Sequence, residues 1–398
     1  MENQNKTHNF YQRTVLAPFL FFWYKVKSYW LKTRLCLQFH LFFCFQNGSQ
    51  VVLTALALAT FPVLYFFTFL YYTDPAAIFF ALLTYHLVLS AKHKSAAAVG
   101  IVSIICRQTN IMWVVFGAGL TIGQILVRWI QLDKKQGAGE EKRVSDWSVL
   151  SKTLSLMGRS LRHNPKELAN LAVDVCKAVW CYAMVGMAFA IFIIVNKGLV
   201  VGDRSNHQPC LNFPQLFYFL FITTFFSFMY MVSLRQVKDF LRYALASPIK
   251  TILFFLVAGL FISKFMFIHE YNLADNRHYN FYFLSKIIRR NEYSRFMLIP
   301  AYYYAFVTFW NLLRNKDIFW KLSYLICVAA TVIPQRMVEF RYFIMPYLIF
   351  RLNMPMPSKW ILWTEILFYL GVNTWTVYMY IYKPFPWASA SSLQRFMW

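Results

Sequence analysis

The sequence alternates between long apolar runs and short polar loops over most of its 398 residues. A helix needs about 20 mostly apolar residues to cross the hydrocarbon core of a bilayer, and runs of this kind recur from residue 51 onward. They are too long and too uniformly apolar for barrel strands, so the pattern predicts an all-α, polytopic transmembrane helix bundle of about 11–13 spans. The well-defined spans are expected at 51–72, 75–91, 95–106, 111–130, 176–200, 213–234, 249–268, 296–313, 317–333, 342–352 and 360–382.

Two of these runs, 95–106 and 342–352, are too short to cross a bilayer, since about 12 helical residues cover only about 18 Å. Pro346 also removes a backbone donor from the second run and would kink it. Both runs are therefore expected to be broken or re-entrant helices that line a cavity.

Composition agrees with a membrane protein, because 59% of the residues are hydrophobic and only 14% are charged. The formal net charge of +24 comes from residues scattered through the loops, not from one patch, so it does not indicate a nucleic-acid partner. Short cytoplasmic loops are enriched in Lys and Arg. This rule assigns to the cytosol Lys92 and Lys94, the segment 131–170, the loops 235–250 and 314–321, and Arg351 with Lys359.

The same pattern predicts four regions along the chain. Residues 1–50 form an atypical N-terminal segment, and 51–130 form a first group of transmembrane helices. Residues 131–170 form a cytosolic basic linker, and 171–398 form a second helix group with lumenal polar loops.

Five polar loops then fall on the lumenal side and carry Arg, Asp, Asn and His between aromatic residues. They are 72–75 (YTDP), 107–110 (RQTN), 202–209 (GDRSNHQP), 273–282 (LADNRHYNFY) and 334–342 (PQRMVEFRY). Taken singly, each arginine is better explained as an interfacial anchor or as the partner of a nearby carboxylate. Taken together, the arginines favour a phosphate or pyrophosphate, since guanidinium groups bind phosphate oxygens bidentately. The predicted phosphate-binding set is Arg107, Arg204, Arg277, Arg336 and Arg341.

Several longer motifs occur in a fixed order: FLYYTD (69–74), RQTNI (107–111), VGDRSNHQPCLNFPQLFYF (201–219), LADNRHYNFY (273–282), IPQRMVEFRYFIMPYLIFRLN (333–353) and QRFMW (394–398). From about residue 51 to 398 the chain closely resembles the endoplasmic-reticulum α-1,2-glucosyltransferases that use dolichyl-phosphate-glucose. The resemblance implies a GT-C-like, multi-pass enzyme of the endoplasmic reticulum membrane with a lumenal active face. It also implies a dolichyl-phosphate-glucose donor and a dolichyl-pyrophosphate oligosaccharide acceptor that already carries two glucoses. We expect no cofactor.

That family is expected to carry an Asp-Glu motif in an early lumenal loop, and this chain contains no Asp-Glu pair. No catalytic base can be carried over from that motif. The remaining lumenal candidates are Asp74, Asp203, Asp275 and Glu339. The predicted sugar and acceptor contacts are Asp203, His207, Asp275, Asn276, His278 and Tyr279.

Asp203 with His207 and Asp275 with His278 each have a spacing that could share a metal ion, but two ligands are too few, so no metal is expected. The absent acidic motif leaves a second class of function open. The chain would then be a non-catalytic membrane partner, such as a channel accessory subunit, or a truncated inactive isoform. A transporter is a third class, but the sequence has no inverted repeat to support it.

Overall fold

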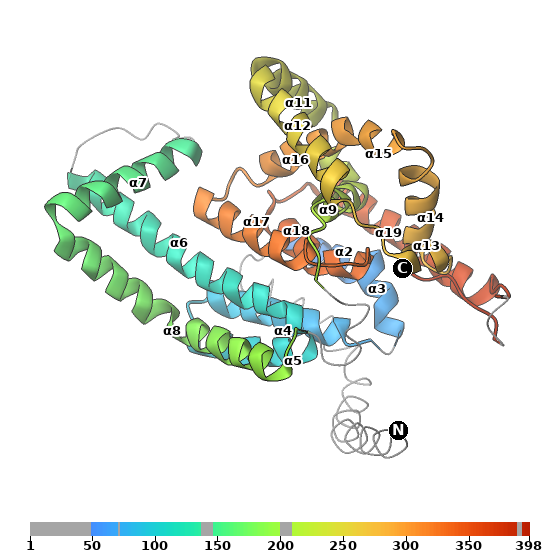
Figure 1. The fold of residues 1–398 in the computed structure, drawn as a ribbon, viewed down its shortest axis with the longest axis horizontal. Coiled ribbons are helices and arrows are strands. Elements are labelled where there is room, and N and C mark those ends of the chain that lie inside the picture. Colours follow the sequence, from blue (N-terminus) through green and yellow to red (C-terminus); the bar gives the residue numbers. More distant parts are fainter. Residues whose placement is uncertain (1–48, 71, 137–145, 200–208, 388–391) are drawn as a thin grey trace, which may run out of the picture. The chain divides into compact units, whose positions relative to one another are not determined.

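The computed structural model describes residues 49–70, 72–136, 146–199, 209–387 and 392–398, which are mostly helical (Figure 1). These residues contain no β-strand, only two isolated β-bridges, which join His278 to Met397 and Phe385 to Gln394. The predicted all-α class is confirmed.

Each predicted apolar run forms a helix or two consecutive helices. They are α2 (Ser49–Ala59), α3 (Pro62–Phe69), α4 (Asp74–Leu89), α5 (His93–Cys106), α6 (Ile111–Gln136), α8 (Pro165–Asn196), α9 (Pro214–Phe226), α10 (Phe228–Met231), α12 (Pro248–Phe265), α16 (Ile299–Leu312), α17 (Ile318–Val332), α18 (Ile344–Asn353) and α19 (Lys359–Tyr382). The other helices are α7 (Asp146–His163), α11 (Leu234–Ala246), α13 (Glu270–Ala274), α14 (Tyr279–Phe283) and α15 (Ser294–Met297). Short 3₁₀ segments cover Gln108–Asn110 and Phe340–Phe343, and a π-helical turn covers Leu284–Ile288.

Within the described residues, three helices are long and apolar enough to cross a membrane, or four if α2 and α3 are counted as one broken span. The three are Gln108–Gln131, Pro165–Asn196 and Pro248–Phe265. Several of the remaining runs form shorter apolar helices, among them α4, α5, α9 and α17. A break shortens one of these helices, since the 213–234 run is divided between α9 and α10 at Ser227. The expected number of 11–13 spans stays a prediction.

Local sequence signals explain where several helices begin. Proline stands in the first turn of α8, α9 and α12, where its missing N–H costs no intrahelical hydrogen bond. Asp317 caps α17 by accepting a hydrogen bond from the backbone N–H of Trp320 at 2.9 Å.

Glycines allow α6 to approach α17 closely. A Cβ atom added to Gly119 would lie 2.6 Å from Oγ of Ser323, and one added to Gly123 would lie 2.9 Å from Cβ of Phe319. Small residues spaced four apart commonly permit such contacts between membrane helices. Helix α6 also packs against α4 and α8, so it is the central helix among α4, α6, α8 and α17.

The range 131–170, predicted as a linker, is largely helical where the structure describes it. It contains the end of α6, all of α7 and the start of α8. Lys321 of α17 is only 2% exposed and pairs with Asp146 at the start of α7, which fixes α7 to the helix group. The two-group division of the chain and the cytosolic position of this range stay predictions.

The chain divides into two compact units. Among described residues, the smaller unit comprises 49–61 and Pro357–Tyr369, in which Leu53 and Ala57 pack against Leu362 and Ile366. The larger unit comprises Pro62–Met356 and Leu370–Trp398, and contains all the polar side chains discussed below.

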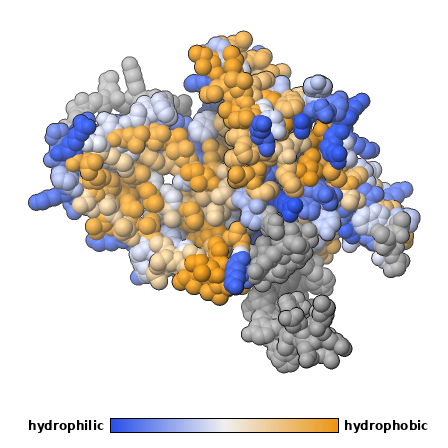
Figure 2. Space-filling model, in the orientation of Figure 1, coloured by the Kyte–Doolittle hydropathy of each residue, from blue (hydrophilic) through white to orange (hydrophobic). Residues whose placement is uncertain are grey.

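Two long helices of the larger unit expose apolar side chains. On α8, Ile194 and Val195 are 75% and 77% exposed, and on α12 Ile249 and Leu256 are also exposed. Figure 2 shows the apolar surface over both helices. Exposed surfaces of this kind match a lipid environment, so the helices have the character of a membrane protein.

Candidate active site

Two of the predicted polar loops meet at a buried carboxylate. Asp74 begins α4 and is 2% exposed, and its Oδ1 accepts a hydrogen bond from Nη1 of Arg107. Arg107 follows the last residue of α5, so the ion pair connects the end of one helix to the start of its neighbour. Asn110 strengthens the connection, because its side-chain amide donates to the carbonyl of Ala77 at 3.0 Å and to Oγ of Ser103 at 2.8 Å.

The loop 334–342 reaches the same carboxylate through Arg341. Its Nη1 lies 3.9 Å from Oδ2 of Asp74, and its Nε donates a hydrogen bond to Oε2 of Glu339. The guanidinium also lies over the ring of Tyr72, 5.5 Å from the centroid, while that of Arg107 lies 5.1 Å from the centroid of Tyr342. Aromatic faces attract guanidinium groups, so these rings help hold both arginines in place.

The loop 273–282 holds a compact cluster of one carboxylate, one guanidinium and one imidazole. Arg277 donates to both oxygens of Asp275, from Nε to Oδ1 at 2.8 Å and from Nη2 to Oδ2 at 2.6 Å. Its backbone N–H also donates to Oδ1 at 3.0 Å. Nε2 of His278 lies 3.7 Å from Oδ2 of the same carboxylate.

The pKa values reflect this pairing. Burial alone would raise the pKa of Asp275, but the hydrogen bonds from Arg277 outweigh it and hold the pKa below its ordinary value. The pKa of Arg277 is raised because its charged form donates to Asp275. Burial lowers the pKa of Arg107 to about 10, so this guanidinium is still charged at neutral pH.

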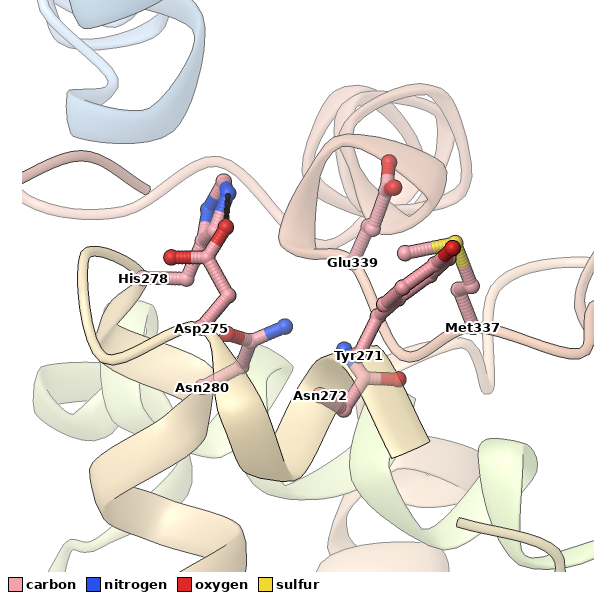
Figure 3. Close-up of a pocket in the computed structure, with 7 residues that line it drawn as sticks. All are labelled: Tyr271, Asn272, Asp275, His278, Asn280, Met337 and Glu339. Carbon is pink, nitrogen blue, oxygen red and sulfur yellow. Dashed lines mark ion pairs between the residues drawn. The ribbon is translucent and has the colours of Figure 1, made fainter. Parts of the chain in front are cut away.

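A small cavity of about 40 Å³ lies between the loops 273–282 and 334–342. It is lined by Tyr271, Asn272, Asp275, His278, Asn280, Met337 and Glu339 (Figure 3). In this view Asp275 and His278 stand on one side, and Glu339 and Tyr271 on the other. A water molecule needs about 10–15 Å³ of such space, so the cavity has room for a few waters but not for a hexose. A sugar would require the loops around it to separate.

Buried asparagines fix one wall of this cavity. Asn272 forms two hydrogen bonds with the backbone of Val338, donating to its carbonyl and accepting from its N–H, both at 3.1 Å. Asn280 donates to the same carbonyl. These contacts attach the segment before Glu339 to α13 and α14, so the position of Glu339 depends on both asparagines.

Comparison with known proteins identifies the chain. The model of the DIE2/ALG10 family matches residues 13–352. The chain belongs to the DIE2/ALG10 family.

Curated relatives extend this DIE2/ALG10 assignment. A protein of Mus musculus named "Dol-P-Glc:Glc(2)Man(9)GlcNAc(2)-PP-Dol alpha-1,2-glucosyltransferase" is 41% identical over 354 residues, covering 88% of this chain and 74% of the relative. Proteins with the same name from Homo sapiens and Drosophila melanogaster are 40% and 31% identical, each over 88% of this chain and over 74% and 76% of the relative. No solved structure matches the chain.

The structure brings together many, but not all, of the residues predicted for a DIE2/ALG10 site. Asp74, Arg107, Glu339 and Arg341 form one connected group, and Asp275, Arg277 and His278 form another. The guanidinium of Arg336 instead lies over the ring of Phe267, 5.0 Å from its centroid. Asp203, Arg204 and His207 lie outside the described residues.

Two predicted sugar contacts have a property suited to that role. Oδ1 of Asn276 and the hydroxyl of Tyr279 are buried and have no hydrogen-bond partner in the described part of the chain. Buried polar atoms are normally hydrogen-bonded, so these atoms are available to a bound ligand or to water.

The alternative explanation from the sequence, that each arginine pairs with a nearby carboxylate, holds for three of the arginines. Arg107, Arg277 and Arg341 pair with Asp74, Asp275 and Glu339 respectively. The described residues contain no group of three or more His, Cys, Asp or Glu arranged to hold a metal ion.

Several residues of the site were not singled out from the sequence. The asparagines Asn272 and Asn280 carry no pattern that predicts a backbone partner some 60 residues away. The segment 392–398 contributes Gln394, which accepts a hydrogen bond from Arg277. Its QRFMW motif was part of the resemblance, but the motif alone does not reveal its partner.

Proposed function

We propose that this chain transfers glucose from dolichyl-phosphate-glucose to the diglucosylated lipid-linked oligosaccharide, forming an α-1,2 linkage. The observation that carries the proposal is the 41% identity over 88% of the chain to a relative with that named activity. The chain is thus a hexosyltransferase of dolichol-linked oligosaccharide assembly.

We place the chain as a multi-pass protein in the endoplasmic reticulum membrane, with the loops that carry Asp74, Arg107, Asp275 and Arg341 facing the lumen. The apolar helices support the membrane location. The distribution of Lys and Arg among the loops supports the orientation.

Conversion of a β-linked phosphate donor to an α-linked product inverts the anomeric carbon, so the reaction is a single displacement. The acceptor oxygen attacks the anomeric carbon, the bond from that carbon to the phosphate oxygen breaks, and dolichyl phosphate leaves as an anion. A carboxylate accepts the proton of the acceptor hydroxyl, and guanidinium groups stabilise the negative charge on the departing phosphate.

Glu339 is the described carboxylate that best suits the base. It lines the cavity, and its hydrogen bond from Arg341 uses only Oε2. Asp74 is almost fully buried between two arginines, and Asp275 has a lowered pKa and already accepts three hydrogen bonds from Arg277. Both are therefore poorer proton acceptors.

Arg107 and Arg341 are the best-placed phosphate ligands. A guanidinium has five N–H donors, and each of these two side chains uses one of them in a hydrogen bond to a carboxylate. Arg277 already uses Nε, Nη1 and Nη2. We therefore assign Arg277 to the support of Asp275, with a smaller part in binding the donor.

The experiment is complementation of cells that lack the native enzyme, followed by analysis of their lipid-linked oligosaccharides. The wild-type chain is expected to restore the triglucosylated form, and Arg341→Gln to lower its amount at least tenfold at equal protein level. Arg242→Gln, on the exposed surface of α11, is the matched control and is expected to behave as wild type. Persistent accumulation of the diglucosylated form with a folded wild-type chain would contradict the proposal and favour a non-catalytic role.

A further inference from the structure

The segment 392–398 returns to the fourth polar loop and pairs with its backbone. The N–H of Met397 donates to the carbonyl of Arg277 at 2.9 Å, and the N–H of Tyr279 donates to the carbonyl of Met397 at 3.1 Å. Together they form the parallel bridge between His278 and Met397. The helices on either side, α13 and α14, have only five residues each, so the loop depends on this outside support.

Gln394 holds the guanidinium of Arg277. Its Oε1 accepts from Nη1 of Arg277 at 2.9 Å, while its own Nε2 donates to the carbonyl of Ser392 at 2.8 Å. The second contact orients the amide, because it directs the NH₂ group away from the arginine. Two backbone hydrogen bonds with Phe385, at 2.9 and 3.0 Å, fix the position of Gln394 itself.

The same segment orients the imidazole of His278. Nδ1 of the ring lies 3.1 Å from the main-chain oxygen of Trp398. An oxygen of this kind only accepts hydrogen bonds, so Nδ1 carries the proton. Nε2 is thereby directed toward Asp275, at 3.7 Å from Oδ2.

Aromatic packing connects the segment to the other wall of the site. The indole of Trp398 lies 5.0 Å from the ring of Tyr279 and 5.6 Å from that of Phe340, centroid to centroid. Phe340 directly follows Glu339 and belongs to the loop that carries Arg341. The segment therefore contacts both loops that border the cavity.

We propose that the segment 392–398 is a positioning element of the transfer site, with Gln394 as the positioning residue for Arg277. This inference rests on the proposed function. In the described part of the chain, the guanidinium of Arg277 contacts the carboxylate of Asp275, the amide of Gln394 and the ring of Trp387, whose centroid lies 4.9 Å away. Among these groups, Gln394 is the one that accepts from Nη1. Without that acceptor, the Asp275–Arg277 pair rotates and the geometry of the sugar site is lost, while the helices remain folded.

The test compares Gln394→Leu, which keeps the size but removes the acceptor, with Gln394→Glu, which keeps an acceptor oxygen. Leu393→Ala is the control, since that side chain is 61% exposed. Purified proteins are assayed for glucosyl transfer, thermal unfolding, and deuterium uptake in the peptide that covers residues 275–282. Gln394→Leu is expected to lower kcat about tenfold with an unchanged melting temperature and increased uptake. Gln394→Glu is expected to remain within about threefold of wild type, and Leu393→Ala to match it.

The two proposals fail in different ways. A folded wild-type chain that makes no product overturns the proposed function, and the deuterium uptake of Gln394→Leu then still tests the positioning. An active wild type with Gln394→Leu unchanged in kcat and in uptake overturns the inference. A loss of melting temperature with normal kcat per folded molecule also overturns it, because it would show a purely structural contact.

Discussion

Arg107 and Asp74 form a hydrogen-bonded ion pair between two segments 33 positions apart in the sequence. The carboxylate is almost completely buried, and Arg341 approaches its other oxygen. Three polar loops are thereby connected through one aspartate.

Substitution of Asp74 is expected to destabilise the protein strongly. Asp74→Asn leaves two guanidinium groups without their shared counter-charge, which for a buried pair costs about 3–5 kcal/mol. Thermal unfolding in detergent measures the effect. The control is Asp239→Asn, because the exposed pairs of Asp239 with Arg235 and Arg242 are together expected to contribute no more than about 1 kcal/mol. Equal losses in the two variants would show that Asp74 is not the connecting residue described here.

Stability is expected to depend on pH through Asp275. Its pKa in the folded protein lies below the ordinary value of 3.8, so the ionised form is favoured by folding. The resulting stability is present above that value and is lost as the pH falls through the lower, folded pKa. The melting temperature of the wild type should therefore fall more than that of Asp275→Asn between about pH 5 and about pH 3. Parallel pH profiles of the two proteins would contradict the assignment.

Two helical glycines, one at the contact between α6 and α17 and one on α8, are expected to respond differently to an added methyl group. Gly123→Ala places a methyl group against Cβ of Phe319 and is expected to cost about 1–3 kcal/mol. Gly186→Ala, on α8, meets no atom within 4 Å and is expected to be neutral or to stabilise by up to about 1 kcal/mol. The melting temperatures of both variants are measured in the same detergent. A Gly123→Ala variant with the melting temperature of the wild type would rule out the close approach of α6 to α17.

Helix α11 is expected to lie at the membrane interface. A row of apolar side chains on it is exposed: Leu234, Val237, Leu241 and Leu245. The basic residues Arg235, Lys238 and Arg242 follow one edge of this row, a position that suits contact with lipid headgroups. A fluorophore attached at position 241 in vesicles should be quenched by brominated acyl chains, whereas one at position 242 should not. Equal quenching at the two positions would show that the apolar row does not face lipid.

The helices could be predicted from the sequence because apolar length is a local property. Every predicted run corresponds to one or two helices, and the short runs at 95–106 and 342–352 form the short helices α5 and α18. The burial of α18 could not be predicted from the sequence. The distribution of loop charges assigns Arg351 to the cytosolic side, and in the structure this side chain is 2% exposed and donates a hydrogen bond to the hydroxyl of Tyr230 at 2.7 Å. A count of loop charges does not reveal that a helix end packs inside the protein.

The side-chain partners within the site could be predicted only in part. Asp275 with Arg277, and Glu339 with Arg341, are close neighbours in the sequence, and pairing with a nearby carboxylate is one of the explanations that the sequence offers for each arginine. The pair of Asp74 and Arg107, and the contact of Gln394 with Arg277, depend on how distant segments fold back, which no local pattern encodes. The roles of these side chains in binding and catalysis stay predictions.

Glucosyl transfer by purified protein tests the central claim most directly. The protein is supplied with dolichyl-phosphate-glucose and the diglucosylated acceptor, and the oligosaccharide product is analysed. The wild type is expected to form the triglucosylated product, and Glu339→Gln, which keeps the size but cannot accept the proton, is expected to be at least about a hundredfold slower. A folded wild type without product, or a Glu339→Gln variant as fast as the wild type, would contradict the account.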